Sequence, residues 1–328
     1  MDCRLLPQSS QKRCHAESVL KNIQVSNEKK KTYYINKRKI NDHIYGYLFS
    51  APLIIGLTLF FFIPLGYAVY LSFTNYSFAN LDSYHFIGID NYVKAFQDEW
   101  FLRSLLNALI NAIGVPIGVF FALILSNILV KNPKFSVFYR TIYYIPTICG
   151  AVAITFIWKW LYTPIYGFLP KIFEFFGVKN MIFLGEDYFF PSMIVMGIWS
   201  GLGTSVLLLF AALKNISKSL YEAAEMDGCN GFQKFLHVTL PGVSPITFYI
   251  LITGIMGSFQ DFSRFQVVRG GVLTKWSVMP VWYIYNYSSS TWNYQLGYAS
   301  ALGILLGLVI LCLSAFNFVI SKLWVKYE

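Results

Sequence analysis

The chain has 328 residues, of which 56% are hydrophobic, 19% are aromatic and only 13% are charged. Soluble globular proteins average about 25% charged residues, so this composition excludes a soluble globular protein and indicates an integral membrane protein. The formal net charge of +10 lies mostly before Asn41, beside the first apolar run, and therefore does not indicate a nucleic-acid partner.

The first 40 residues form a basic tail without apolar periodicity, with KKK at 29–31 and KRK at 37–39. Basic clusters beside a first apolar helix bind anionic lipid and fix the topology, and a regulatory or partner-binding tail is the alternative. No small-residue cleavage site follows a short apolar core, so the first apolar run is expected to be a retained helix. The sequence thus predicts a basic cytoplasmic tail at 1–40 and a transmembrane domain at 41–328.

Six apolar runs follow, each long enough to cross a bilayer, which takes about 20 residues. Their bounds are close to 45–73, 105–130, 135–161, 189–213, 243–262 and 296–320. With six spans, both termini and the segments 131–140 and 214–241 share one side. That side holds 18 of the 26 Lys and Arg and 8 of the 16 Asp and Glu. Cytoplasmic segments collect Lys and Arg, so the sequence predicts an all-α integral membrane protein with six transmembrane helices and both termini inside.

Three outward segments connect these spans. In the first, 74–103, the apolar residues Ile89, Tyr92, Val93 and Phe96 repeat at helical spacing and predict a short amphipathic helix at the membrane interface. The second, 162–188, contains YGFLPKIFEFFGV, which is also aromatic and amphipathic. The third, 263–294, is expected to lie along the outer membrane surface, with contact to a delivered ligand protein as the alternative. It carries Trp276, Trp282, Tyr283, Tyr285, Tyr287, Trp292 and Tyr294.

Motifs for catalysis, metal binding or nucleotide binding are missing from the sequence. The five cysteines and four histidines are far apart, so neither a disulfide framework nor a metal site is predicted. GxxxxGK[ST], GxSxG and HExxH are all absent. We therefore expect a non-enzymatic chain without catalytic residues, which binds no cofactor, metal or nucleic acid.

A polar stretch, YEAAEMDGCNGFQKFLHVTLP at 221–241, separates the fourth and fifth apolar runs. Ser219 to Glu222 fits a capping box, which predicts a helix from there to Gly228, where glycine permits the left-handed end. A second short helix is expected from Gly231 to Val238, with Pro241 preventing its continuation. Two short helices at an angle would form a rigid element suited to docking in a partner's groove and transmitting its movement.

This stretch resembles the EAA loop of permease subunits of bacterial ATP-binding-cassette (ABC) importers. The matching residues are Glu222, Ala223, Ala224, Asp227, Gly228, Val238, Leu240, Pro241 and Pro245. The resemblance extends from about Tyr45 to Lys322 and is strongest to the carbohydrate permeases of the maltose and glycerol-phosphate type. Further similar segments are FIGIDNYVKAF at 86–96, FYRTIYYIP at 138–146, GSFQDF at 257–262 and LGYASAL at 296–302. One departure is VRGGVLTKW at 268–276, where many relatives have TGGGP.

The resemblance implies a type I ABC importer permease in the bacterial cytoplasmic (inner) membrane, with an ATPase-coupling loop at 217–245. It implies a second permease subunit, expected to be a different chain, two ATPase subunits that bind ATP and Mg, and an extracytoplasmic solute-binding protein. Glu222 would pair with a basic residue of the ATPase, and Gly228 would form the turn. The residues Ala223, Ala224 and Leu240 would pack the coupling helices, with Asp227 and Pro241 in the same loop.

Polar or small residues near the outer end of the spans are candidates for the solute pathway, because polar groups inside a membrane usually serve function. They are Gln260, Asp261, Arg264, Gly257, Ser258, Asn107 and Trp199. An amide such as that of Gln260 can both donate to and accept from sugar hydroxyls. Asp261 and Arg264 are three residues apart and could equally form an ion pair on one helix face.

The expected solute is a carbohydrate, first an oligosaccharide and otherwise a polyol or glycerol-phosphate. A self-contained secondary transporter or channel is the alternative class, and it would show inverted repeats or several ionisable residues at mid-membrane. A membrane-embedded enzyme would need a cluster of catalytic groups at one depth. The sequence shows neither feature.

Overall fold

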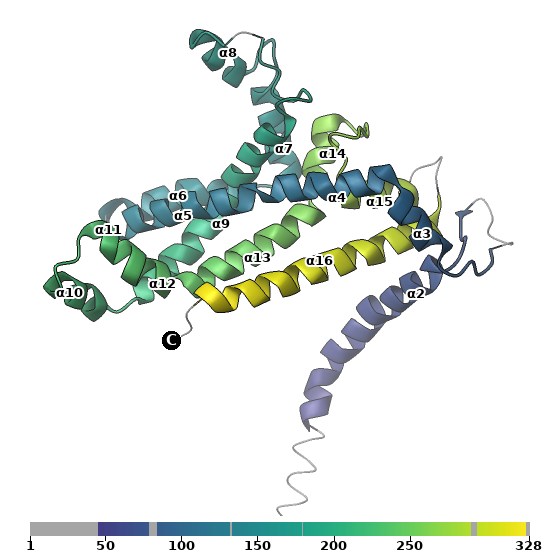
Figure 1. Ribbon diagram of the computed structural model, residues 1–328, viewed down its shortest axis with the longest axis horizontal. Helices are drawn as coiled ribbons and strands as arrows, with labels where there is room; N and C mark the ends of the chain where they lie inside the picture. Colours follow the sequence, from purple (N-terminus) through teal and green to yellow (C-terminus); the bar gives the residue numbers. More distant parts are fainter. Residues whose placement is uncertain (1–44, 79–83, 132, 179, 290–293, 326–328) are drawn as a thin grey trace, which may run out of the picture. The chain divides into compact units, whose positions relative to one another are not determined.

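The computed structural model of the chain describes residues 45–78, 84–131, 133–178, 180–289 and 294–325. The predicted tail at 1–40 and Trp292 lie outside these residues. The described chain is helical apart from turns, loops and one isolated bridge between Thr74 and Phe86. It divides into two compact units, residues 1–67 and 68–328. Figure 1 draws the helices coloured along the sequence, from purple near the N-terminus to yellow near the C-terminus.

One long apolar helix, Tyr45–Ser72, carries the first predicted span and runs from the first unit into the second. It contains a π turn, η2 (Thr58–Phe62), followed by α2 (Ile63–Ser72). The Ile63 N–H donates to the Thr58 carbonyl, five residues back. This wider turn lies directly before Pro64, which has no N–H of its own to donate.

The second unit contains the remaining candidate spans. Three are long helices: α4 (Glu99–Ala112) with α5 (Gly114–Lys131), α9 (Phe189–Asn215) and α16 (Leu296–Trp324). Two further candidates are bent pairs: α6 (Pro133–Ile148) with α7 (Ala151–Leu161), and Gly231–Gly242 with α13 (Ser244–Gln260). Among the described residues, four helices, counting Tyr45–Ser72, could cross a membrane, or up to six if each bent pair is one span.

The third predicted span is not one continuous helix, because α6 and α7 meet at 107°. Pro146 removes a hydrogen-bond donor from the end of α6, and Gly150 takes an extended conformation before α7 begins. The fifth predicted span is also shorter than expected. The helix α13 has 17 residues, which at about 1.5 Å per residue gives about 25 Å, less than the about 30 Å of a hydrocarbon core.

Small residues bring the helices of this unit close together. Val206 and Leu209 of α9 are buried in a cluster with residues of α5 and α13. A Cβ on Gly203 of α9 would overlap the backbone carbonyl of Tyr143 on α6. Transmembrane helices without a hydrophobic driving force between them associate through such close backbone contacts.

The amphipathic helix predicted in the first outward segment is present as α3 (Asp90–Gln97), and exposed apolar side chains suit a helix at a membrane interface. Ile89 and Phe96 are 64% and 66% exposed, whereas Asn91 and Ala95 are buried. The Asn91 amide donates to the Ser72 carbonyl at 2.8 Å and to the Thr74 carbonyl at 2.9 Å. These hydrogen bonds explain why Asn91 is buried.

The second and third outward segments contain α8 (Phe168–Phe175), α14 (Ser263–Arg269) and α15 (Pro280–Ser289). For Trp282 and Tyr283 the expectation of surface anchoring is wrong, because both are buried inside the protein. The Tyr283 hydroxyl donates to Asp98 Oδ2 at 2.7 Å, and burial raises the pKa of this tyrosine well above its usual range.

Asp98 holds four elements together. Its Oδ1 accepts from the backbone N–H of Trp100 at 2.9 Å and so caps α4. Its Oδ2 accepts from Tyr283 of α15 and, at 2.6 Å, from Tyr298 of α16. Its own backbone N–H donates to the Ala95 carbonyl at the end of α3. These four elements therefore meet at Asp98, three of them through its carboxylate.

Candidate functional site

The segment 217–245 begins with α10 (Lys218–Met226), and its first residue differs from the prediction. The N-cap is Ser217, whose hydroxyl oxygen accepts from the Ser219 N–H at 3.3 Å. Ser217 has the extended backbone that an N-cap needs, so the helix starts before the predicted box. Glu222 is exposed and makes no hydrogen bond to any residue that the structure describes. Its carboxylate is therefore available to a partner.

A tight turn follows at Gly228, which has φ +75° as predicted. The Cys229 N–H donates to the Ala224 carbonyl at 2.9 Å, which closes the end of α10. A capping box then starts α11 (Gly231–Lys234), since Asn230 and Gln233 exchange hydrogen bonds at 2.8 and 2.9 Å. Sequence reasoning missed this box, although the N-x-x-Q spacing was readable.

The second helix does not end at Pro241, contrary to the prediction. It continues from α11 through a π turn, η4 (Phe235–Thr239), into α12 (Leu240–Gly242). The Leu240 N–H donates to Phe235, five residues back, and this wider turn accommodates the proline ring. The chain bends by 66° only after Gly242, where α13 begins.

Side-chain bonds hold the two halves of the segment against each other. Lys234 Nζ lies 2.6 Å from Glu225 Oε1, and the Tyr221 and Thr239 hydroxyls are 3.0 Å apart. At the surface, Met226 is 89% exposed. The segment is therefore a braced helical element with an exposed apolar tip.

The predicted coupling residues fall into two groups. Glu222, Ala223 and Asp227 are exposed on α10 and at its end. Ala224 is buried, and Leu240 packs against the cluster that α5, α9 and α13 form. The first group is thus accessible to another chain, while Leu240 connects the segment to the helices of the membrane region.

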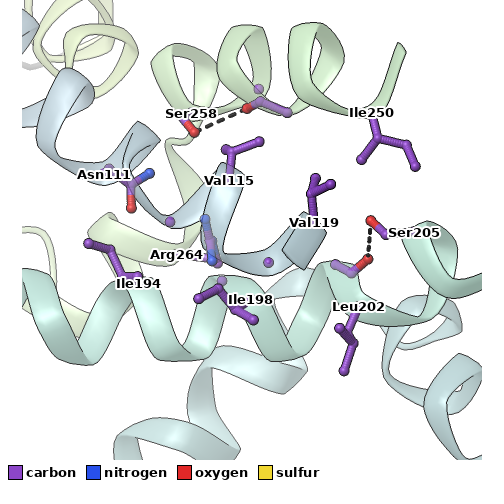
Figure 2. A pocket seen from close by; sticks show the side chains of 16 residues that line it. Asn111, Val115, Val119, Ile194, Ile198, Leu202, Ser205, Ile250, Ser258 and Arg264 are labelled. Carbon is purple, nitrogen blue, oxygen red and sulfur yellow. Dashed lines mark hydrogen bonds between the residues drawn. The ribbon is translucent and has the colours of Figure 1, made fainter. Parts of the chain in front are cut away.

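A cavity of about 200 Å³ lies among α4, α5, α9, α13 and α14 (Figure 2). Glycines form much of its wall: Gly114, Gly118, Gly197, Gly201, Gly254 and Gly257. At Gly201 and Gly257 a Cβ would meet no atom within 4 Å, so these two residues leave open space. The missing side chains at these two positions therefore contribute to the open space, while the other four glycines lie against neighbouring side chains.

Four polar side chains line the same cavity: Asn111, Ser205, Ser258 and Arg264. Each serine hydroxyl donates to a carbonyl of its own helix, at 3.2 Å for Ser205 and 3.1 Å for Ser258, which leaves the oxygens able to accept. The Asn111 side chain is 6% exposed and makes no hydrogen bond within the described residues. An amide without a partner in a cavity wall is suited to hydroxyl groups of a ligand.

Arg264 reaches the cavity from α14 and forms an ion pair with Asp261. The ion pair was one of two predicted alternatives, but the two residues do not share one helix face. The helix α13 ends at Gln260 with Asp261 as its C-cap, and Arg264 lies on α14. The guanidinium lies against Gly197 of α9, where a Cβ would be 2.6 Å from Nη1. Glycine at 197 thus makes room for this side chain.

Three of the seven predicted pathway residues line the cavity, namely Gly257, Ser258 and Arg264. Gln260 is exposed and does not line the cavity. Asn107 is fully buried and donates to the carbonyls of Lys275 and Val278, which is a structural role. Trp199 packs edge-on against Trp158 at 5.6 Å between ring centroids.

Sequence reasoning missed Asn111, Ser205 and most of the glycines. The pairs Gly114/Gly118 and Gly197/Gly201 have four-residue spacing, which is typical of close helix contacts in membranes and was readable. The position of Asn111 opposite α9 and α13 follows from tertiary packing and gives no local signal.

Comparison with known proteins extends these observations. Residues 114–325 match the family "Binding-protein-dependent transport system inner membrane component". The chain is 31% identical over 88% of its length to the probable ABC transporter permease protein YesP of Bacillus subtilis, covering 93% of that protein. It is 28% identical to the sn-glycerol-3-phosphate permease protein UgpA of Agrobacterium fabrum, over 83% of this chain and 92% of that one. It is also 28% identical to the arabinooligosaccharides permease protein AraP of Bacillus subtilis, over 84% and 88%.

A solved structure has a similar fold. A chain of a bacterial alginate ABC transporter, in complex with an alginate pentasaccharide-bound periplasmic protein, superposes with a TM-score of 0.73 at 22% identity, over 85% of this chain and 94% of that one. The mostly helical architecture with several membrane-length helices is thus that of an ABC importer permease. The chain therefore belongs to the inner-membrane components of binding-protein-dependent transport systems, as a non-catalytic permease subunit of the ABC sugar importer type whose ATP hydrolysis belongs to partner ATPases.

Proposed function

We propose that the chain forms the solute pathway of a carbohydrate importer and couples this pathway to ATPase subunits through the segment 217–245. The observation that carries the proposal is that the same two helices connect the cavity with the segment 217–245. Helices α9 and α13 both line the cavity, and both join the segment 217–245 directly at their other ends. From Ser205 to the end of α9 at Asn215 there are ten residues, or about 15 Å of helix. A displacement of the segment therefore reaches the cavity through rigid elements.

The braced geometry supports this coupling role. Since Lys234 and Tyr221 fix the two halves of the segment, a push on its exposed face moves it as one body. Leu240 then transmits the movement into the cluster of α5, α9 and α13. Closure of ATPase subunits on ATP would open the cavity outward, and hydrolysis would reset it. The exposed Glu222 would pair with a basic residue of the ATPase, by a charge-assisted hydrogen bond.

A second permease and a binding protein complete the proposed importer. Small-molecule pockets usually measure about 300–1,000 Å³. The cavity of about 200 Å³ is smaller and holds roughly one sugar unit, so an oligosaccharide needs further space beside it. A second permease subunit, expected to be a different chain, would supply that space, with two ATPases inside and a solute-binding protein outside. The uneven distribution of Lys and Arg supports a cytoplasmic location for both termini.

For the solute we propose an oligosaccharide. The uncharged hydrogen-bonding groups of the cavity wall suit hydroxyls, and AraP is named for arabinooligosaccharides. UgpA, at equal identity, is named for sn-glycerol-3-phosphate, which makes a glycerol-phosphate ester the alternative.

Co-purification tests the coupling role. The tagged chain is extracted in mild detergent from native membranes, and the ATPase that accompanies it is quantified for wild type, Glu222→Ala and Gly228→Val. Valine in the left-handed conformation costs about 1–2 kcal/mol, so the turn shifts. Gly231→Ala is the matched control, because the position has negative φ and open space around it. We expect less ATPase with the first two variants and an unchanged amount with the control. An absence of ATPase from the wild-type preparation would refute the proposal.

A further inference from the structure

Arg264 is the only charged residue among those that line the cavity in the described part of the chain. An unpaired guanidinium there would attract anions, since hydrogen bonds between ionised partners are about twice as strong as neutral ones. The charge of this side chain therefore decides which solutes the cavity favours.

The charge of Arg264 is cancelled by Asp261. Their side chains are only 19% and 9% exposed, so water screens the pair little. A guanidinium has five N–H groups, and pairing with one carboxylate leaves some of them for other acceptors. Together with Asn111 and Ser258, the paired Arg264 gives the wall several donors and acceptors but no net charge.

The neighbouring cations are also engaged and do not line the cavity. Lys159 Nζ donates to the Val267 carbonyl at 3.1 Å, near the end of α14. The Arg269 guanidinium stacks over the Trp276 ring, 4.4 Å from its centroid. Neither side chain is placed to replace Arg264 as an anion-binding group.

We infer that Asp261 is a specificity-determining residue: by pairing with Arg264 it makes the cavity favour uncharged, hydroxyl-bearing solutes over phosphate esters and acidic sugars. This inference rests on the proposed function, because it concerns the solute of the same cavity. Asp261 acts through Arg264 and is a positioning residue.

The test measures occupancy of the cavity in the intact complex. The native cysteines are replaced by serine, and Ile198→Cys provides a thiol in the cavity wall whose alkylation rate is measured. Ile198 is next to Gly197, against which the Arg264 guanidinium lies. Sulfate, compared with chloride at equal ionic strength, is the anionic probe. A bound probe slows alkylation by the factor 1 + [L]/Kd, which is about threefold at twice the dissociation constant.

We expect sulfate to leave the alkylation rate unchanged when Asp261 is present and to slow it about threefold or more in Asp261→Asn. Asp261→Glu should behave like the wild type. The double variant Asp261→Asn with Arg264→Gln should lose the sulfate effect, which would locate the anion at Arg264. Sulfate protection of the chain with native Asp261, or none in a folded Asp261→Asn variant, would overturn the inference.

Asp261→Asn leaves a shielded charge unpaired and could prevent folding, so a second comparison uses only the chain with native Asp261 and Arg264. Trigalacturonate should not slow alkylation of this chain, and clear protection by it would contradict the inference. The ATPase that co-purifies is measured on the same samples. Protection by an anion with the ATPase still bound refutes the inference alone, whereas loss of the ATPase from every sample refutes the proposed function.

Discussion

Filling the cavity should abolish transport without destabilising the protein. At Gly257 a Cβ would meet no atom within 4 Å, and the residue lines the cavity from α13. A leucine side chain occupies a volume on the order of 100 Å³. For comparison, a Leu→Ala change in a packed core opens a cavity of about 150 Å³. Gly257→Leu would therefore remove about half of the roughly 200 Å³. The substitution also replaces glycine in a helix, which stabilises the helix by up to about 1 kcal/mol.

The assay compares ATP-driven sugar uptake into membrane vesicles with the thermal stability of the purified complex. We expect Gly257→Leu to lower uptake at least about tenfold, which corresponds to about 1.4 kcal/mol, and to leave the unfolding temperature equal or higher. Gly303→Leu on α16 is the matched control, because it also faces open space but lies outside the cavity wall. Uptake at the wild-type rate by a folded Gly257→Leu complex would refute the assignment of this cavity to the solute pathway.

Three further substitutions and one control test the helix packing, the role of Asp98 and the exposed carboxylate of Glu222. Gly203→Ala should lower the unfolding temperature clearly, because its Cβ overlaps the Tyr143 carbonyl, while Gly201→Ala, in open space, should not. Asp98→Ala should destabilise by about 2–4 kcal/mol in thermal unfolding, since it removes an N-cap and the acceptor of two tyrosine hydroxyls; an unchanged unfolding temperature would contradict the role of this residue. Glu222→Ala should change stability by less than about 0.5 kcal/mol, and a larger loss would show that its carboxylate has a partner within the chain.

The sequence predicted the apolar helices well where the pattern is local and continuous, as in α9 and α16. It also located Gly228, because a left-handed turn after a run of helix formers has a clear local signal. The bend between α6 and α7 was missed. Pro146 was visible, but an apolar run that continues through Cys149 and Gly150 gives no sign that the axis turns by 107°.

The candidate site was only partly predictable from the sequence, because the cavity is lined by glycines and side chains from several helices. Ser258 and Arg264 were found by their polarity, but Asn107 has the same polarity and serves packing. Asn111, one helical turn further along, is the amide that faces the cavity. The difference between them depends on which neighbours supply hydrogen-bond partners, and that follows only from the tertiary structure.

Site-directed cross-linking tests the central claim most directly. Met226 is 89% exposed at the tip of the segment 217–245, and Phe175, at the end of α8, is 86% exposed on a predicted outward segment. Each is replaced by cysteine in a chain without other cysteines and treated with a short bifunctional thiol reagent in native membranes. The account predicts that Met226→Cys cross-links to an ATP-binding subunit and that Phe175→Cys does not. A cross-link from Phe175→Cys to the ATPase, or none from Met226→Cys in a complex that still contains the ATPase, would contradict the account.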